Sequence, residues 1–396
     1  PMAIFPGIRE LKESIGAQIT EQPEIPDSYN PQPGDDHKFM ARALKLAERG
    51  VATSHPNPRV GCVITRNGVV VGEGWHRAAG EPHAEVHALR QAGRLARDGT
   101  LYVNLEPCCH QGRTPPCTDA IIRAGISRVV CAMEDPNPLV NRAGISALQH
   151  AGINVELGVA RDQALYLNRG FVSRVTRGIP WVTLKIAVSL DGKTALASGE
   201  SQWITSEEAR RDAHRVRSAS SAIVTGVGTV LRDNPRMTAR MPGVERQPLR
   251  VILDSRLSTP VDAAILDEPG NVLILTSPES VVDADLYPKT NVEIMGCAMQ
   301  GSSVDLQAVL EELGRRGIND LMLEAGARLS GSMLAQGLVD DLVVYMAPDL
   351  LGDAARGMFG IPGIESMQDK QKLRFRDLRQ IGRDMRLVLD VVREQR

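Results

Sequence analysis

The chain has 396 residues, a formal net charge of −2 and 3% aromatic residues. This length predicts two to three domains with an ample core. Its near-neutral charge and few aromatic rings do not suit nucleic acid or an anionic membrane as a partner. No apolar run approaches the ~18 residues that cross a bilayer. We therefore expect a protein that acts on small molecules, with no nucleic acid or membrane partner.

The cysteines and the N-terminus predict a cytoplasmic location. Six cysteines in a chain of this length, three of them in one short stretch, indicate reduced thiols. The N-terminus has acidic residues from Glu10 onward and lacks the basic–apolar–cleavage order of a secretory signal. We expect the proline-rich residues 1–34 to form a loosely docked extension. Cys62, Cys131 and Cys297 are expected to be buried and inert.

The first half of the chain alternates helices and strands. Apolar residues at helical spacing predict a helix that begins at Asp35 or Asp36 and ends at Arg49, before Gly50. The alternation is typical of an α/β sandwich with a mostly parallel inner part, where ligands bind at the carboxyl ends of the strands. The other expected elements are strands 60–64 and 69–72, joined by a turn at 66–68, helix 83–96, strand 100–104, helix 118–124, strand 128–133, helix 142–150 and strand 153–156.

The second half predicts another α/β domain. A helix over 162–176 joins the two halves, and residues 177–180 mark the boundary. We therefore expect one domain at 35–178 and a second at 179–396. The second domain should contain a helix from Ser206 to Arg217 and strands at 181–188, 222–225, 250–253, 272–276, 321–324, 342–346 and 386–392.

Two glycine-containing junctions at the ends of strands suggest a dinucleotide site. They lie at 226–229 and 324–329. Backbone amides at such a junction suit a phosphate. The first junction has Gly226 and Gly228 but lacks the third glycine of the dinucleotide-binding fingerprint. Taken singly, each junction also fits a plain backbone turn.

Residues 83–117 carry the residue types of a zinc hydrolase. The stretch begins with His83-Ala84-Glu85 and ends with two thiols, Cys108 and Cys117. Zinc binds histidine nitrogen and cysteine thiolate, and a catalytic site leaves one position open for water. The order H-x-E and then P-C-x-x-C is the signature of zinc deaminases. Here eight residues, not two, separate the two thiols.

The chemistry assigns a role to each of these side chains. His83, Cys108 and Cys117 are the expected zinc ligands, and the bound metal would lower the pKa of water to roughly 7. Glu85 would take the proton of that water and deliver it to the ring nitrogen and the leaving ammonia. This geometry requires His83 at the start of a helix, which Pro82 indicates.

Several alternatives stay open around this stretch. Prolines 115–116 place Cys117 at the start of a second helix, where a thiol pKa is lowered. Cys109, His110 and His87 are rival ligands from the same region. The rigid turn at 135–138 follows a strand and is either part of the pocket rim or a plain turn.

At these motifs the chain resembles the bifunctional riboflavin-biosynthesis family, in which a diaminohydroxyphosphoribosylaminopyrimidine deaminase is fused to a 5-amino-6-(5-phosphoribosylamino)uracil reductase. The similarity covers about residues 35–390. The long loop between Cys108 and Cys117 is specific to this branch of deaminases. The matching stretches are 55–61, 83–85, 106–117, 135–138, 189–193, 200–205, 324–329 and 337–340.

The resemblance implies a fold and two consecutive reactions. The N-terminal domain would have the cytidine-deaminase-like three-layer α/β/α fold and would remove the pyrimidine 2-amino group with Zn²⁺. The C-terminal domain would have a dihydrofolate-reductase-like α/β fold. It would reduce the ribosyl group to ribityl, with hydride transfer from NADPH to the sugar C1. A homo-oligomer, a dimer through the second half, is also implied.

The resemblance further implies the binding residues of the reductase. Arg217 and Arg240 suit the sugar phosphate, because a guanidinium pairs bidentately with phosphate. Lys185 could polarise or protonate the C1 imine nitrogen; the alternative is an outward-facing strand lysine. The implied NADP contacts are Ala187, Trp203, Thr229, Asp233, Ser255, Gly326, Ala327, Arg328, Leu329, Ser330, Gly331 and Ser332, and the substrate contacts are Ser201, Arg217, Met237, Arg240 and Glu324.

Two other functions fit parts of the sequence. One is a nucleoside or nucleobase deaminase whose second domain is not catalytic. The other is a binding module in which zinc is purely structural, and such a site is closed by four protein ligands.

Overall fold

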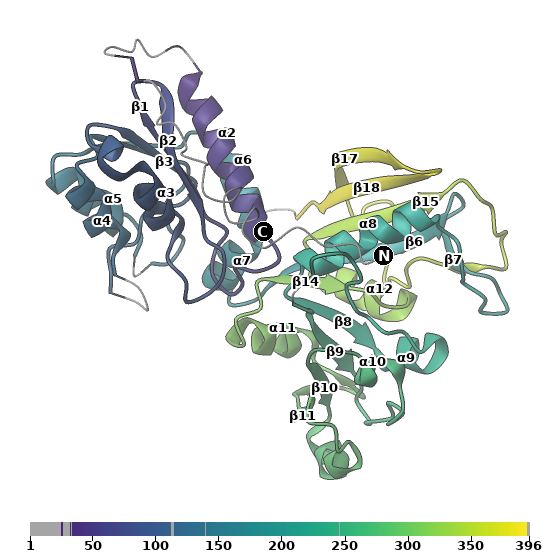
Figure 1. Cartoon of the computed structure of the whole chain (residues 1–396). Coiled ribbons are helices and arrows are strands. Elements are labelled where there is room, and N and C mark those ends of the chain that lie inside the picture. The colour runs from purple at the N-terminus through teal and green to yellow at the C-terminus, as the bar shows by residue number, and fades with distance from the viewer. Residues whose placement is uncertain are drawn as a thin grey trace, which may run out of the picture.

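The computed structural model describes residues 25–26, 32, 34–111, 115–138, 140–244 and 246–393. Two α/β domains follow one another along the chain, the first drawn purple to blue and the second teal to yellow (Figure 1). Most of the expected extension at 1–34 lies outside the described residues. No helix in the described part of the chain is both long and apolar enough to cross a membrane.

The first domain contains a five-stranded sheet with the order β2-β1-β3-β4-β5. The predicted hairpin is confirmed, and its first strand also pairs antiparallel with β3, while β3, β4 and β5 are parallel. The mostly parallel inner part therefore begins at β3. The bounds are β1 (Gly61–Arg66), β2 (Val69–Trp75), β3 (Thr100–Val103), β4 (Arg128–Cys131) and β5 (Asn154–Leu157).

Four helices of this domain agree with the predicted ones. They are α2 (Asp35–Ala47), which a 3₁₀ turn extends to Gly50, α3 (Ala84–Ala92), which a 3₁₀ turn extends to Ala96, α4 (Cys117–Ala124) and α5 (Ala143–His150). Glycines in the hairpin let helices pack directly on the sheet. A Cβ on Gly74 would lie 2.2 Å from the Ala84 carbonyl oxygen, and one on Gly61 would lie 2.0 Å from the Ala43 carbonyl oxygen. This close packing fixes the start of α3 against β2.

The connection between the domains differs from the prediction. Instead of one helix over 162–176, there are two, α6 (Arg161–Leu167) and α7 (Arg169–Arg177). They are separated at Asn168, whose buried side chain binds the backbone of Arg59 from the other end of the domain. This long-range contact has no periodic signal in the sequence. In Figure 1, α7 lies between the two domains.

The second domain is built on a nine-stranded sheet with the order β11-β10-β9-β8-β14-β6-β15-β18-β17. The first seven strands in this order are parallel, β18 runs antiparallel to β15, and β17 runs antiparallel to β18. All seven predicted strands are present within two residues. The bounds are β6 (Trp181–Ser189), β8 (Ala222–Gly226), β9 (Leu249–Leu253), β10 (Val272–Thr276), β11 (Val292–Gly296), β14 (Asp320–Leu323), β15 (Asp341–Ala347), β17 (Leu373–Ile381) and β18 (Asp384–Val391).

Helices and short strands complete this domain. The predicted basic helix is α8 (Glu207–Ala219), and helices follow both glycine junctions. The sequence did not predict α11 or the edge strands β11 and β17; the latter is largely exposed and lacks a buried apolar face. The bounds are α9 (Val227–Asp233), α10 (Ala264–Asp267), α11 (Leu306–Arg315), α12 (Ala327–Ala335), the 3₁₀ segment η3 (Pro278–Leu286), β7 (Lys193–Ala195), β12 (Met299–Gln300), β13 (Ser303–Val304) and β16 (Arg356–Gly357).

Candidate functional site

The structure brings the three predicted metal ligands together. His83 immediately precedes α3, Cys117 is the first residue of α4, and Cys108 lies in the loop after β3. His83 Nδ1 is 3.2 Å from Cys117 Sγ and 3.5 Å from Cys108 Sγ. Tetrahedral zinc with bonds of about 2.0–2.3 Å separates such ligand atoms by roughly 3.5–3.8 Å. These residues therefore fit Zn²⁺, and they are the one candidate metal-binding group found among the described residues.

Two helix starts hold this group in place. The first amides of α4 point at Cys108: Cys117 N donates to Cys108 Sγ at 3.4 Å, and Thr118 N donates to the Cys108 carbonyl at 3.2 Å. His83 is the extended residue before α3, so it and Glu85 can approach the same point. This is the placement that Pro82 indicates.

Glu85 lies beside the group, and one of its carboxylate oxygens is uncommitted. Its side chain is buried in the first turn of α3, and Oε2 has no hydrogen-bond partner among the residues that the structure describes. Burial raises the pKa of Glu85 above its ordinary value. A buried, uncommitted carboxylate oxygen beside residues that fit Zn²⁺ is what a water-activating base would require.

The two thiols differ in acidity. The hydrogen bond to the Cys117 side chain, followed by that to His83, lowers the pKa of Cys108 to about 4. We expected a lowered pKa for Cys117 from its place at a helix start. The place is as predicted, but the neighbouring Cys108 and burial raise the pKa of the Cys117 thiol. Two adjacent thiolates require a cation between them, which suits a Zn²⁺ donor set.

The rival ligands do not join the group. His110 is exposed, and Cys109 and His87 are half-buried, but none belongs to the set of mutually close donor atoms. His87 lies one turn after His83 on α3, where burial lowers its pKa. Cys62, Cys131 and Cys297 are buried, as predicted.

Glu106 organises the loop around Cys108, although no sequence pattern assigned it a role. Its Oε2 accepts from the amides of Asp135 and Arg142, both at 3.0 Å, and its Oε1 accepts from the Gly144 amide at 2.9 Å. A Cβ on Gly144 would lie 2.0 Å from the Pro107 carbonyl oxygen. The turn at 135–138 is thus tied to the loop that carries Cys108, which favours the rim interpretation over a plain turn.

His76 is a second residue that sequence reasoning missed. It is 2% exposed, and its ring meets the His83 ring edge-on with centroids 5.4 Å apart. His76 Nε2 is 3.0 Å from Asn57 Nδ2, and Nδ1 is 3.3 Å from the Pro82 carbonyl oxygen. An Nδ1–H tautomer satisfies both contacts, donating to the carbonyl and accepting from Asn57. In the sequence, the one pattern that could have pointed to this contact was the His-Pro-Asn-Pro motif at 55–58, which contains Asn57.

In the second domain, Glu324 gathers two cations at the end of β14. Arg217 of α8 binds both carboxylate oxygens, with Nε 2.5 Å from Oε1 and Nη2 2.9 Å from Oε2. Lys185 of β6 has its Nζ 3.6 Å from Oε2. Its side chain is 18% exposed and faces this carboxylate, so Lys185 is not an outward-facing strand lysine.

The charged groups of this cluster shift one another's pKa values. Burial raises the pKa of Glu324, but the charges of Arg217 and Lys185 outweigh it and hold that pKa at about 2. Burial lowers the pKa of Lys185, which Glu324 partly offsets. The carboxylate therefore stays ionised while the lysine gives up its proton more easily than a solvated lysine would.

The loop after α9, which carries the predicted residues Met237 and Arg240, lies against Arg217 of α8. Arg217 Nη1 donates to the Thr238 carbonyl at 3.1 Å; Thr238 follows the buried Met237 and precedes the exposed Arg240 by two residues. The Arg240 amide donates to His214 Nδ1 at 3.2 Å, which links this loop to α8 a second time. Glu324 thus binds the Arg217 guanidinium. Among the described hydrogen bonds, the Arg240 guanidinium makes a single one, to Thr238 Oγ1.

The predicted cofactor residues follow the carboxyl ends of parallel strands. Gly226 and Gly326 precede α9 and α12, and a Cβ on Gly226 would lie 3.3 Å from Leu329 Cδ2, so the two junctions are neighbours. The start of a helix at this edge fits a cofactor phosphate. The residues placed along this edge are Ala187 near the end of β6, Thr229 and Asp233 on α9, Ser255 after β9, Gly326, Ala327, Arg328, Leu329, Ser330, Gly331 and Ser332.

Two predicted residues are not brought to this cluster. Ser201 and Trp203 lie in the loop before α8, and Trp203 is 67% exposed with the Arg210 guanidinium 4.5 Å from its ring centroid. Among the described contacts, none joins either residue to Glu324 or to α12.

Two models of known protein families match the chain. The model of the cytidine and deoxycytidylate deaminase zinc-binding region matches residues 33–133, and that of the RibD C-terminal domain matches residues 180–387. Fold and sites together define a two-domain enzyme, in which a zinc-dependent deaminase precedes an NADPH-dependent reductase.

Relatives extend over nearly the whole chain. The riboflavin biosynthesis protein RibD of Escherichia coli is 47% identical, covering 89% of this chain and 99% of its own. RibD of Acinetobacter baumannii has a similar structure, with a TM-score of 0.84, 43% identity and coverage of 91% and 100%. A diaminohydroxyphosphoribosylaminopyrimidine deaminase/5-amino-6-(5-phosphoribosylamino)uracil reductase of Thermotoga maritima has a TM-score of 0.81, 32% identity and coverage of 90% and 99%. The chain belongs to the RibD family of riboflavin biosynthesis proteins.

Membership confirms the predicted fold class, the two activities and the two cofactors, Zn²⁺ and NADPH. It speaks against the two alternatives, because the second half matches a reductase and the zinc group belongs to a deaminase. Small molecules are the substrates of such an enzyme.

Proposed function

We propose that the first domain deaminates 2,5-diamino-6-(5-phosphoribosylamino)pyrimidin-4(3H)-one. We further propose that the second domain reduces the ribosyl group of 5-amino-6-(5-phosphoribosylamino)uracil to ribityl. The name of the Thermotoga maritima relative supports this substrate pair. The observation that carries the first step is the buried carboxylate of Glu85 beside the His83, Cys108 and Cys117 donor atoms.

For the deamination, we assign His83, Cys108 and Cys117 as zinc ligands and Glu85 as the acid–base residue. Zn²⁺, when bound, supplies a hydroxide at neutral pH by lowering the pKa of water. Glu85 would accept one proton of that water and pass it to the ring nitrogen, and would then move the second proton, from the hydroxyl group now on the ring carbon, to the amine that departs as ammonia. Its raised pKa suits both directions, since a carboxyl that titrates nearer neutrality can take up a proton and release it again.

For the reduction, we assign Lys185 as the proton donor to the C1 imine nitrogen. NADPH, when bound, supplies the hydride that adds to C1. Glu324 keeps the Lys185 ammonium oriented, and burial makes its proton easier to release. Arg240 is the better placed phosphate ligand, because Arg217 already binds Glu324 through both carboxylate oxygens.

The remaining contacts complete the reductase proposal. We assign substrate contacts to Ser201, Arg217, Met237, Arg240 and Glu324. The cofactor would lie along the edge formed by the ends of β6, β8, β9 and β14, with its phosphates at the start of α12. Its proposed contacts are Ala187, Trp203, Thr229, Asp233, Ser255 and residues 326–332.

The domain limits, assembly and location are also part of this proposal. We place the domain boundary after Gly178, which has a φ of 74° and follows α7. A homodimer through the second domain is supported by β17, an edge strand on which Phe375 is 61% and Leu378 is 53% exposed. Edge strands with apolar side chains pair readily with another chain. Six free thiols support a cytoplasmic location.

A single assay tests the two reactions. The diaminopyrimidine ribosyl phosphate is added to the zinc-loaded protein, ammonia release is followed first, and NADPH oxidation is then followed in the same cuvette. Both signals should appear in that order. Ammonia release without NADPH oxidation would contradict the proposed reduction, and the absence of ammonia would contradict the proposed deamination.

A further inference from the structure

One loop of the deaminase domain contacts two parts of the molecule. It bonds His76, the neighbour of the proposed zinc ligand His83, and it bonds the reductase domain. The 54–59 loop, Ser54 to Arg59, leads into β1. On its inner side, Asn57 Nδ2 is 3.0 Å from His76 Nε2, and the buried His76 ring lies against His83. The position of Asn57 therefore affects the orientation of a proposed zinc ligand through one intermediate ring.

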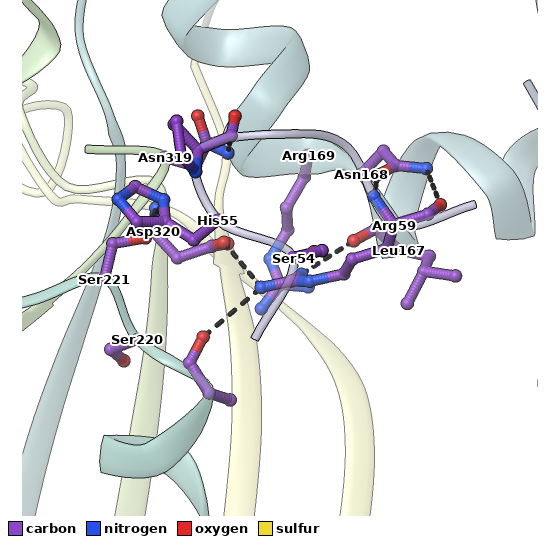
Figure 2. A network of polar contacts seen from close by, with 12 residues as sticks. Ser54, His55, Arg59, Leu167, Asn168, Arg169, Ser220, Ser221, Asn319 and Asp320 are labelled. Carbon is purple, nitrogen blue, oxygen red and sulfur yellow. Dashed lines mark hydrogen bonds and ion pairs between the residues drawn. The ribbon is translucent and has the colours of Figure 1, made fainter. Parts of the chain in front are cut away.

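The outer side of the loop is bound by the second domain. The Pro56 carbonyl accepts from Asn319 Nδ2 at 3.0 Å, and His55 Nδ1 lies 2.8 Å from Ser221 Oγ. Arg59 Nη2 donates to Asp320 Oδ2 at 2.6 Å, which Figure 2 shows beside the His55–Ser221 contact. These three partners lie at the amino ends of β8 and β14, so the sheet of the second domain holds the loop.

The first domain holds the same loop at its far end. Arg59 is 9% exposed, and Asn168 accepts from its amide at 2.8 Å and donates to its carbonyl at 3.0 Å. Asn104 Nδ2 donates to the same carbonyl at 2.9 Å. An ion pair as buried as that of Arg59 and Asp320 resists separation, because either charge alone would stay desolvated. The loop is thus clamped between the domains.

We propose that the reductase domain is part of the deaminase machinery. Ser221, Asn319 and Asp320 are positioning residues for deamination, acting through the 54–59 loop on Asn57 and His76. The inference rests on the deaminase function proposed above and deepens it. It assigns to the second domain a task in the first reaction that is separate from its own reduction. β14 serves both tasks, since Asp320 begins it and Glu324 follows its last residue.

The test uses the full chain and changes only second-domain side chains. Ser221→Ala removes the hydroxyl at His55, and Asn319→Ala removes the donor to Pro56. Each should raise the KM for deamination about two- to tenfold, as the loss of one net hydrogen bond does. Zinc content and the kinetics of NADPH oxidation on preformed 5-amino-6-(5-phosphoribosylamino)uracil should stay at wild-type values. Ser221→Thr, which keeps the hydroxyl, should restore the deamination KM.

The matched control breaks a different contact between the domains. Arg376 of β17 lies 4.1 Å from the ring centroid of Tyr166 on α6, and neither side chain bonds a residue of the 54–59 loop among the described hydrogen bonds and ion pairs. Arg376→Ala should leave deamination unchanged. Equal loss of deamination in this control, parallel loss of both activities in the test variants, or an unchanged deamination KM would each overturn the inference. Wild-type protein that releases no ammonia would instead refute the proposed function, and the inference with it.

Discussion

Arg59 and Asp320 form an ion pair across the domain boundary, 261 positions apart in sequence, with Nη2 2.6 Å from Oδ2. Their side chains are only 10% and 14% exposed. Arg59 also donates to the carbonyls of Leu167 and Ala219, so its charge is compensated from both domains (Figure 2). The relative position of the two domains therefore depends on a buried charge.

Removal of one partner of this pair should destabilise the protein. Asp320→Ala leaves the Arg59 guanidinium buried without its counter-charge, which costs about 3–5 kcal/mol. Urea unfolding, followed by fluorescence and by loss of each activity, measures the effect. The double variant Arg59→Met/Asp320→Leu should lose much less than the sum of the two single variants. Strict additivity would show that the two charges do not interact.

Replacement of the deaminase base should separate metal binding from catalysis. Glu85→Gln keeps the size of the side chain but cannot accept a proton. Ammonia release should fall by about 10²–10⁴-fold, while zinc content by atomic absorption and reductase activity remain at wild-type levels. Glu81→Gln, an exposed change shortly before α3, is the control. Full deaminase activity in the Glu85 variant would refute the proposed proton transfer.

The reductase proton donor is tested by removal of its charge. Lys185→Met should lower the rate of NADPH oxidation by about 10²–10⁴-fold with little change in ammonia release. Lys289→Met changes a lysine that pairs with Asp267 far from the site, and it should behave as wild type. A Lys185 variant that retained its kcat and changed only KM would show that the lysine binds substrate rather than donating a proton.

His55 should make the domain interface sensitive to acid. Burial, followed by the charge of Arg246, lowers the pKa of His55 to about 4, and Arg174, Arg59 and Asp320 also act on it. The unfolded chain binds this proton near pH 6.5, so its contribution to stability is complete above 6.5 and is lost as pH falls toward 4. The slope from one such group stays below about 1.4 kcal/mol per pH unit.

Thermal melts between pH 7 and 4.5 measure this effect. His55→Asn offers Ser221 an acceptor but does not titrate, so its melting temperature should fall less steeply with acid. His214, whose pKa burial also lowers to about 4, remains in the variant and leaves part of the slope. Identical pH profiles of variant and wild type would exclude His55 as a source of acid sensitivity.

The sequence predicted those helices and strands whose buried side chains recur at short, regular intervals. The apolar spacing of α2, the strands of the second sheet and the turn before β2 were all predictable, because a helix or a half-buried strand repeats its burial within a few residues. β17 was missed because most of its side chains are exposed and show no such repeat. The break at Asn168 was missed because it serves Arg59, 109 positions away.

The order of residue types along the chain was enough to predict zinc chemistry, since that chemistry requires the imidazole, the carboxylate and the two thiols whatever surrounds them. The folded chain was needed to show that Glu324 binds Arg217, that Lys185 faces inward, and that Asp320 anchors a loop of the other domain. Each of those contacts joins residues more than a hundred positions apart. Their geometry follows from how the sheets pack, and packing leaves no periodic trace along the chain.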